Sequence, residues 1–247
     1  MANRRAPALH AQGEAASLFI AAEAAVESAR NQLPPKPARL RRLLDAFALG
    51  ESLPGSTRPA DLVAALNEIR SAVYSAEGYT AECAAMWREA VATAWIAAAL
   101  ARRKRASPGA AGLAGLLHRS GEALALQAVS AQEATAALLL DPATRTQFCA
   151  EHGAELTQAL ARKWRLATPV AVAMTGWRRV GESAALAEEA RIVYGGHTLA
   201  TRSLFSDFRT PGLESALADT LGLSAADLAA LQPELDSIRD AAVRFKA

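Results

Sequence analysis

Signals for starting helices recur along the whole chain, while no segment shows the alternation typical of a surface strand. N-cap residues followed by proline at the first helical position occur at Ser107-Pro108, Asp141-Pro142, Thr168-Pro169 and Thr210-Pro211. Capping-box patterns occur at Ser130–Glu133 and Ser224–Asp227, and Gly222 is well placed to end a helix. Abundant alanine favours closely packed helices. The sequence therefore predicts an all-α fold.

The apolar periodicity divides the chain into helical segments. Helices are predicted near residues 13–32, 38–48, 59–79, 81–105, 108–119, 131–140, 142–164, 169–178, 184–208, 211–221 and 225–245. The loop at 50–59, with Pro54-Gly55-Ser56, predicts a boundary between an N-terminal helical segment with its linker (1–58) and a helical bundle (59–247). The alternative is one continuous domain from about residue 33.

Charge and cysteine content narrow the class of protein. The net charge is +2, and the basic run Arg102–Arg105 has no interleaved aromatic residues, so we expect a solvated helix end and no nucleic-acid partner. Cys83 and Cys149 are predicted to be free thiols in a reducing compartment. Neither a signal peptide nor an apolar run of membrane-spanning length is evident, which favours a cytoplasmic protein without membrane contact.

Six short segments resemble motifs of one known family, in the same order. These are Leu33–Pro37 (LPPKP), Trp87–Ala94, Ala111–Gly121, Glu155–Leu166, Ile192–Ala200 and Leu221–Leu228. Together they resemble the HDOD family, bacterial regulatory proteins related to the HD superfamily of metal-dependent phosphohydrolases. The resemblance implies an HD-domain-like bundle of many helices. The stretch between Pro37 and Arg58 is shorter than in the family, which implies a shortened N-terminal helical subdomain.

The resemblance also maps the metal ligands of HD hydrolases onto this chain. Where those enzymes read A-G-L-L-H-D-I-G, this chain reads A-G-L-L-H-R-S-G, so their His-Asp pair falls at His118 and Arg119. The remaining ligand positions fall at Glu89, at Gly153 beside His152, near Arg178 and Arg179, and at His197. The carboxylate of the His-Asp pair is therefore replaced by a guanidinium, which cannot bind a metal ion.

The residues at these positions predict that the metal site has degenerated. Glu89, His118 and His197 have suitable chemistry, but an arginine ~4 Å from a cation costs about 4 kcal/mol per unit charge at an effective dielectric constant near 20. We therefore predict no catalytic residues, no bound metal and no cofactor. A vestigial cluster remains, in which Glu89 forms an ion pair with Arg119 or Arg178. Alternatively, these arginines hold a phosphate or nucleotide without hydrolysing it.

These observations predict a non-enzymatic signal-transduction module that acts by protein–protein interaction. The resemblance implies a protein partner such as a regulator or a second-messenger enzyme, and homodimerisation is a further option. The alternatives are a metal-dependent phosphohydrolase with replaced ligands and a sensor of a phosphorylated small molecule. The amphipathic segment 225–245 is expected to pack on its own bundle.

Overall fold

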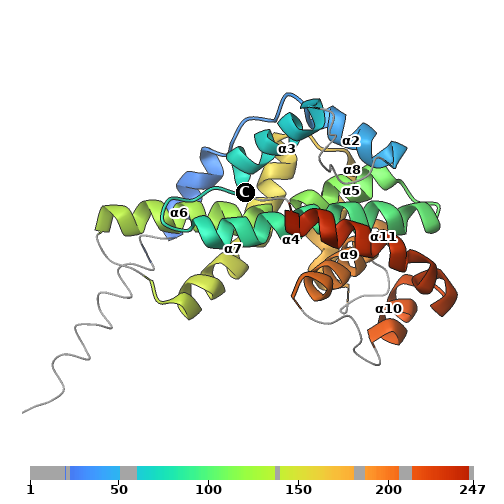
Figure 1. The fold of residues 1–247 in the computed structure, drawn as a ribbon. Coiled ribbons are helices and arrows are strands. Elements are labelled where there is room, and N and C mark those ends of the chain that lie inside the picture. The colour runs from blue at the N-terminus through green and yellow to red at the C-terminus, as the bar shows by residue number, and fades with distance from the viewer. Residues whose placement is uncertain are drawn as a thin grey trace, which may run out of the picture.

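The computed structural model describes residues 20, 23–50, 60–136, 140–180, 187–205 and 213–244, and all regular structure within them is helical (Figure 1). This confirms the predicted all-α class. Residues 23–31 are helical. The elements that follow are α2 (Leu40–Leu49), α3 (Ala60–Val73), α4 (Thr80–Arg103), α5 (Pro108–Leu117), α6 (Ser120–Ala136), α7 (Pro142–Lys163), α8 (Thr168–Gly176), the 3-10 turn η1 (Trp177–Arg179), α9 (Glu188–Phe205), α10 (Leu213–Leu221) and α11 (Ala225–Arg244).

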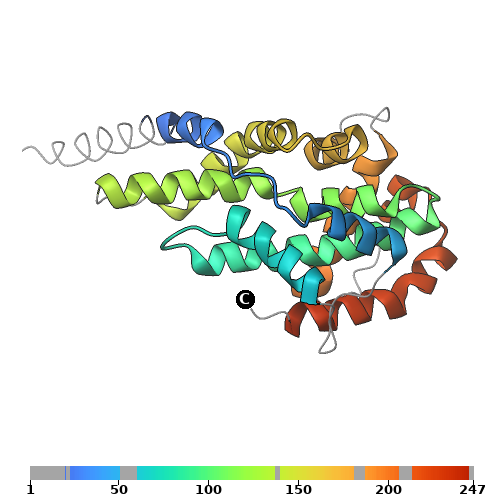
Figure 2. The same cartoon turned by 90° about the horizontal axis from the view of Figure 1, so that it is seen from above.

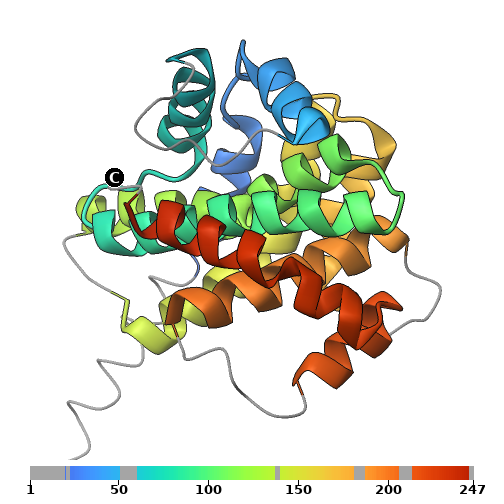
Figure 3. The ribbon, with the colours of Figure 1, turned by 45° about the vertical axis from the view of Figure 1, so that its right-hand side comes forward.

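Helix α4 forms the centre of the bundle. Every residue from Glu89 to Ala101 is buried, as expected for a helix that other helices surround. Helices α5, α9 and α11 pack along it, and Figure 3 shows α4 running between α5 on one side and α9 and α11 on the other. The alanine-rich surface of α4 lets these neighbours approach closely.

Two glycines set how near α5 and α9 come to α4. A Cβ atom at Gly115 on α5 would lie 3.0 Å from the Cα of Ala94, and one at Gly196 on α9 would lie 3.1 Å from the backbone nitrogen of Ala97. Both contacts are to the α4 backbone, so a larger side chain would push the helices apart. Gly115 near the end of α5 and Gly196 in the middle of α9 therefore meet the same turn of α4, around Thr93–Ala97.

Residues 23–34 lie against α6 and α7 (Figure 2). Arg30 forms an ion pair with Glu155 on α7 at 2.6 Å. Just after α7, the Trp164 Nε1 donates to the carbonyl of Pro34 at 3.0 Å, and Lys163 Nζ donates to the carbonyl of Leu33. The predicted boundary at residue 58 lies outside the described residues and stays a prediction.

Three of the predicted helix caps are present. The Ser107 hydroxyl accepts from Ala110 N, and the Asp141 carboxylate accepts from the backbone nitrogens at the start of α7. Ser224 and Asp227 form the reciprocal bonds of a capping box, with Ser224 Oγ accepting from Asp227 N at 3.1 Å. Thr168 is not an N-cap, because α8 begins at Thr168 itself. Thr210-Pro211 lies outside the described residues.

The predicted helix at 131–140 is wrong, because α6 begins at Ser120 and Ser130–Glu133 lies inside it. The polar groups of that pattern make tertiary contacts instead. Ser130 Oγ donates to the carbonyl of Glu77 at 2.6 Å, and the buried Glu133 carboxylate accepts from Leu140 N and from the Tyr79 hydroxyl. In the sequence, a capping-box pattern therefore looks the same as polar side chains that bond to residues far along the chain.

The helix predicted at 59–79 ends early, at Val73. Residues 74–79 form the connection to α4, in which Gly78 adopts the left-handed φ of 76°. Glycine tolerates this conformation without a Cβ clash, so Gly78 was the available signal for a chain reversal.

The basic run at the end of α4 is solvated only in part: Arg102 and Arg105 are exposed, while Arg102, Arg103 and Lys104 form ion pairs within the chain. Arg102 and Arg103 both pair with Glu234 on α11, at 2.7 and 3.3 Å, and Lys104 pairs with Glu188 on α9 at 3.1 Å. These pairs join the end of α4 to α9 and α11, consistent with the expectation that the C-terminal helix packs on its own bundle.

Cys83 and Cys149 are free thiols, as predicted. Burial raises the pKa of both, that of Cys149 to about 12, so neither is a reactive thiolate at neutral pH. No helix among the described residues combines the length and the apolar character that a membrane crossing requires.

Candidate functional site

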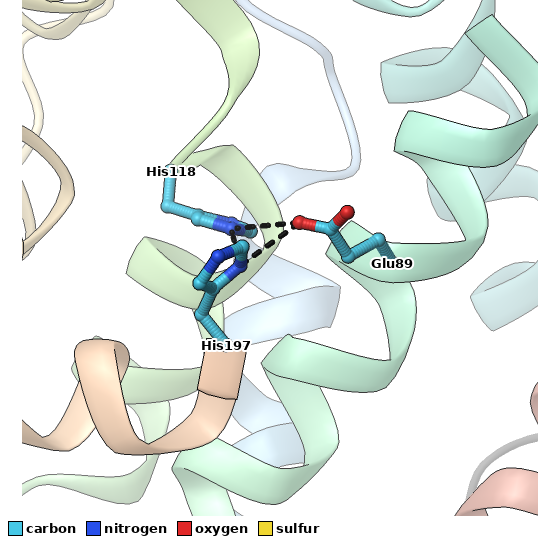
Figure 4. Close-up of side chains that lie close together, drawn as sticks. All are labelled: Glu89, His118 and His197. Carbon is cyan, nitrogen blue, oxygen red and sulfur yellow. Dashed lines mark hydrogen bonds and ion pairs between the residues drawn. The ribbon is translucent and has the colours of Figure 1, made fainter. Parts of the chain in front are cut away.

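Three helices bring Glu89, His118 and His197 together, although these residues are far apart in the sequence. Glu89 is on α4, His118 directly follows α5, and His197 is on α9, next to the close approach at Gly196 (Figure 4). His197 Nδ1 lies 2.9 Å from Glu89 Oε1 and 3.1 Å from His118 Nε2. His118 Nε2 lies 3.7 Å from the same carboxylate oxygen.

The hydrogen-bond partners indicate which ring nitrogens of the two histidines carry protons. His118 Nδ1 lies 2.6 Å from the carbonyl of Gly115, which only accepts, so Nδ1 carries the proton and Nε2 presents a lone pair. His197 Nδ1 faces this lone pair and the Glu89 carboxylate, so Nδ1 of His197 carries a proton as well. Burial lowers the pKa of His118, which favours its neutral form.

Arg119 bridges two buried carboxylates in the same cluster. Its Nη1 donates to Glu89 Oε2 at 2.7 Å, while Nε and Nη2 donate to Glu122 Oε2 at 2.9 and 2.6 Å. The expected ion pair between Glu89 and Arg119 is therefore present. Burial acts to raise the pKa of Glu89, but the His197 Nδ1 group 2.9 Å away and the charge of Arg119 outweigh it and lower that pKa well below its usual range.

Arg178 pairs with Glu122 and not with Glu89. Its guanidinium also lies 4.9 Å from the ring centre of Trp177, over the ring. That ring packs 4.8 Å from His118 and 4.5 Å from His197, and Trp177 Nε1 donates to the carbonyl of His118. Trp177 thus forms a wall of the cluster as well as part of the core.

Glu122 is the member of the cluster that the sequence did not identify. It follows Arg119 by three residues at the start of α6, a spacing that allows ion pairs on a helix, and this spacing was the available signal. Gly153, which takes the place of a family histidine, packs against Glu122: a Cβ there would lie 2.9 Å from Glu122 Cγ.

Two residues near mapped ligand positions lie apart from the cluster. The ring of His152 packs on Phe148, with ring centres 4.3 Å apart. Arg179 is exposed on the surface next to Arg178. The structure therefore assembles Glu89, His118, Arg119 and His197 directly and joins Arg178 to them through Glu122.

The family model for the HDOD domain, built from sequences, matches residues 53–177, just over half of the chain. The chain belongs to the HDOD family. This HDOD chain also resembles two solved structures of proteins from Shewanella amazonensis SB2B. One is a proposed metal-dependent phosphohydrolase, with a TM-score of 0.62, 13% identity, and coverage of 92% of this chain and 99% of that chain. The other is a proposed phosphohydrolase, with a TM-score of 0.54, 20% identity, and coverage of 89% and 98%.

At these identities the two likenesses show a shared fold and no more. Among curated proteins, none matches the HDOD chain significantly.

The side chains of this HDOD centre fit a metal ion only in part. Glu89, His118 and His197 offer one ligand atom each, all within 4.8 Å of one another, and nitrogen and oxygen donors of this kind suit divalent transition metals. The neighbouring guanidinium opposes an added cation, since Arg119 is bonded to the second oxygen of Glu89. Catalytic metal sites combine several protein ligands with an open position for water, and here a fixed cation stands in place of a ligand.

Proposed function

We propose that this HDOD chain is a non-enzymatic regulatory module that acts by binding another protein. The observation that carries the proposal is the bridge from Arg119 to Glu89 and Glu122. In an HD hydrolase, the position of Arg119 supplies a carboxylate to the metal. Here it supplies a cation, and that cation bonds to the carboxylates that remain. The centre is thereby neutralised by side chains of the protein itself.

The burial of this network supports a structural role. The side chains of Glu89 and Glu122 are 8% and 10% exposed, and that of Arg119 is 24% exposed. Buried carboxylates need partners, and removing one partner of such a pair is costly. Loss of any one member would therefore leave a buried charge without its partner at the junction of α4, α5 and α6. Membership of the HDOD family supports a protein partner in the cytoplasm, of the regulator or second-messenger-enzyme class, with self-association as the alternative.

A second candidate function is a phosphohydrolase with replaced ligands. It is favoured by the lone pair on His118 Nε2, which lies within 4.8 Å of two other potential ligand atoms. The Nδ1–H of His118 is held by a backbone carbonyl, an arrangement that also orients histidines which bind metals. This candidate requires the Glu89 carboxylate to serve a metal ion and Arg119 at the same time.

Metal binding separates the two candidates. Three proteins are compared: the wild-type chain and the variants Arg119→Asp and His118→Ala. Each is incubated with Mn²⁺, Fe²⁺ or Zn²⁺ and desalted. Bound metal is then measured by elemental mass spectrometry, and phosphatase activity by hydrolysis of p-nitrophenyl phosphate. We expect the wild-type chain to retain substoichiometric metal and show no turnover. We expect Arg119→Asp to gain metal, because it adds a carboxylate and removes the cation. Stoichiometric wild-type metal that His118→Ala abolishes would refute the proposal.

A partner assay adds a test on the interaction side. A partner isolated with the wild-type chain and then purified should bind His118→Ala with unchanged affinity, since a scaffold has no need of the imidazole. If His118→Ala lost binding while its melting temperature stayed unchanged, the cluster around His118 would have a direct role in binding, which would contradict the proposal.

A further inference from the structure

A cavity of about 670 Å³ lies beside the HD-type centre. Its lining includes Glu89 as well as Arg119, Trp177, Arg178, Tyr194, His197 and Thr201. Small-molecule sites typically have volumes of about 300–1,000 Å³, so a ligand larger than a single ion can enter. The residues from α9 are spaced by three and four positions, which places them along one face of that helix.

Arg178 is the lining residue best able to meet a ligand. Its side chain is 45% exposed, and its guanidinium stands over the ring of Trp177. Trp177 itself is buried and anchored by its bond to the carbonyl of His118. Among the residues that the structure describes, Arg178 bonds only to Glu122, so most of its five N–H groups remain to be satisfied by solvent or a ligand.

Arg178 can leave Glu122 without exposing an unpaired carboxylate. Glu122 already accepts two hydrogen bonds from Arg119, through Nε and Nη2. Arg178 is therefore a second cation on a carboxylate that has one partner in place. A guanidinium held in this way can turn toward an incoming oxyanion while Arg119 keeps its bonds to both carboxylates, and the change costs only the bond to Glu122 Oε1.

The chemistry of the lining selects the class of ligand. Arg119 and Arg178 balance the charges of Glu89 and Glu122, so the cluster has no net negative charge to attract a cation, and the remaining N–H groups of Arg178 are available to an acceptor. Thr201 lines the same cavity, and its buried hydroxyl has no hydrogen-bond partner in the described part of the chain. A phosphate group carries only acceptor oxygens when ionised and matches the planar fork of arginine.

We propose that this cavity binds the phosphate group of a phosphorylated small molecule, with Arg178 as its principal contact and Thr201 as a second donor, and that the ligand is not hydrolysed. This inference rests on the proposed function, because it takes the centre to hold no metal.

Isothermal titration calorimetry on the full chain tests the site, with inorganic phosphate, adenosine 5′-monophosphate and adenosine as probes. We expect both phosphates to bind and adenosine not to, with the ester binding more tightly because the cavity is larger than one phosphate. Arg178→Ala should weaken binding by about tenfold to a hundredfold, the effect of losing a charge-assisted hydrogen bond. Thr201→Val, which keeps the side-chain shape, should weaken it by about two- to tenfold.

Arg179→Ala is the matched control, because Arg179 is the adjacent arginine, is exposed, and does not line the cavity. It should bind as the wild type does. The inference is overturned if neither phosphate binds at millimolar concentration, or if Arg179→Ala weakens binding as much as Arg178→Ala. Failure on these grounds leaves the metal result, and with it the proposed function, untouched. Binding that a chelator abolishes would instead refute both.

Discussion

Replacing Arg119 by methionine should destabilise the chain through charge more than through packing. Methionine keeps much of the aliphatic stem but leaves Glu89 and Glu122 without their shared cation. Breaking a buried ion pair costs about 3–5 kcal/mol. Glu122 keeps Arg178 and Glu89 keeps His197, so we expect the lower end, about 3 kcal/mol. For a chain of this size, that corresponds to a fall of roughly 6–12 °C in melting temperature.

The loss should depend on pH in a defined direction. In the wild-type chain the pKa of Glu89 is lowered, so its contribution to the free energy of unfolding is complete above the ordinary pKa of 4.5 and is lost as the pH falls toward the folded-state value. In Arg119→Met, the charge of Arg119 no longer opposes burial, so the pKa of Glu89 rises from its wild-type value. The deficit of the variant is then largest at neutral pH and shrinks toward pH 4.5, where the carboxyl groups can protonate.

Thermal and urea unfolding, followed by circular dichroism near neutral pH and near pH 4.5, measure this difference. Arg41→Met is the matched control, because Arg41 pairs with Asp45 on the surface with 84% and 47% of the side chains exposed. Such a pair contributes at most about 0.5 kcal/mol. The double variant Arg119→Met with Glu89→Gln should recover part of the loss. An equal gap between wild type and Arg119→Met at both pH values would refute the reasoning and assign the loss to packing.

Two further substitutions test the framework that holds the cluster. Gly121→Ala should lower the free energy of unfolding by more than about 3 kcal/mol, because its Cβ would lie 1.8 Å from the Gly153 carbonyl oxygen where α6 crosses α7. Urea unfolding measures this loss. A loss below about 1 kcal/mol would show that the two helices are packed less closely than described. Ser107→Ala should lower the free energy of unfolding by about 1 kcal/mol, because it removes the N-cap of α5, and Ser107→Asn should keep most of the wild-type stability. Equal stability of Ser107→Ala and the wild type would mean that the cap contributes nothing.

The sequence by itself determined the helical class of the fold and several of its helix ends. Caps such as Ser107, Asp141 and Ser224 act on neighbouring backbone groups within a few residues, so their effect can be read locally. The resemblance to the HDOD family also named Glu89, His118, Arg119 and His197 before their proximity was known. It was able to do so because the motifs occur in the order in which the fold uses them.

Only the tertiary structure decided which charged groups meet. Arg178 is bonded to Glu122 and not to Glu89, Arg102 and Lys104 pair with α11 and α9, and Ser130 bonds to a distant carbonyl where a helix start was predicted. Each of these choices depends on how helices cross, which small residues such as Gly196 set through contacts between backbones. The residues of an ion pair can be far apart in the sequence but must lie within a few ångströms in space, so the sequence alone could not specify which of them pair.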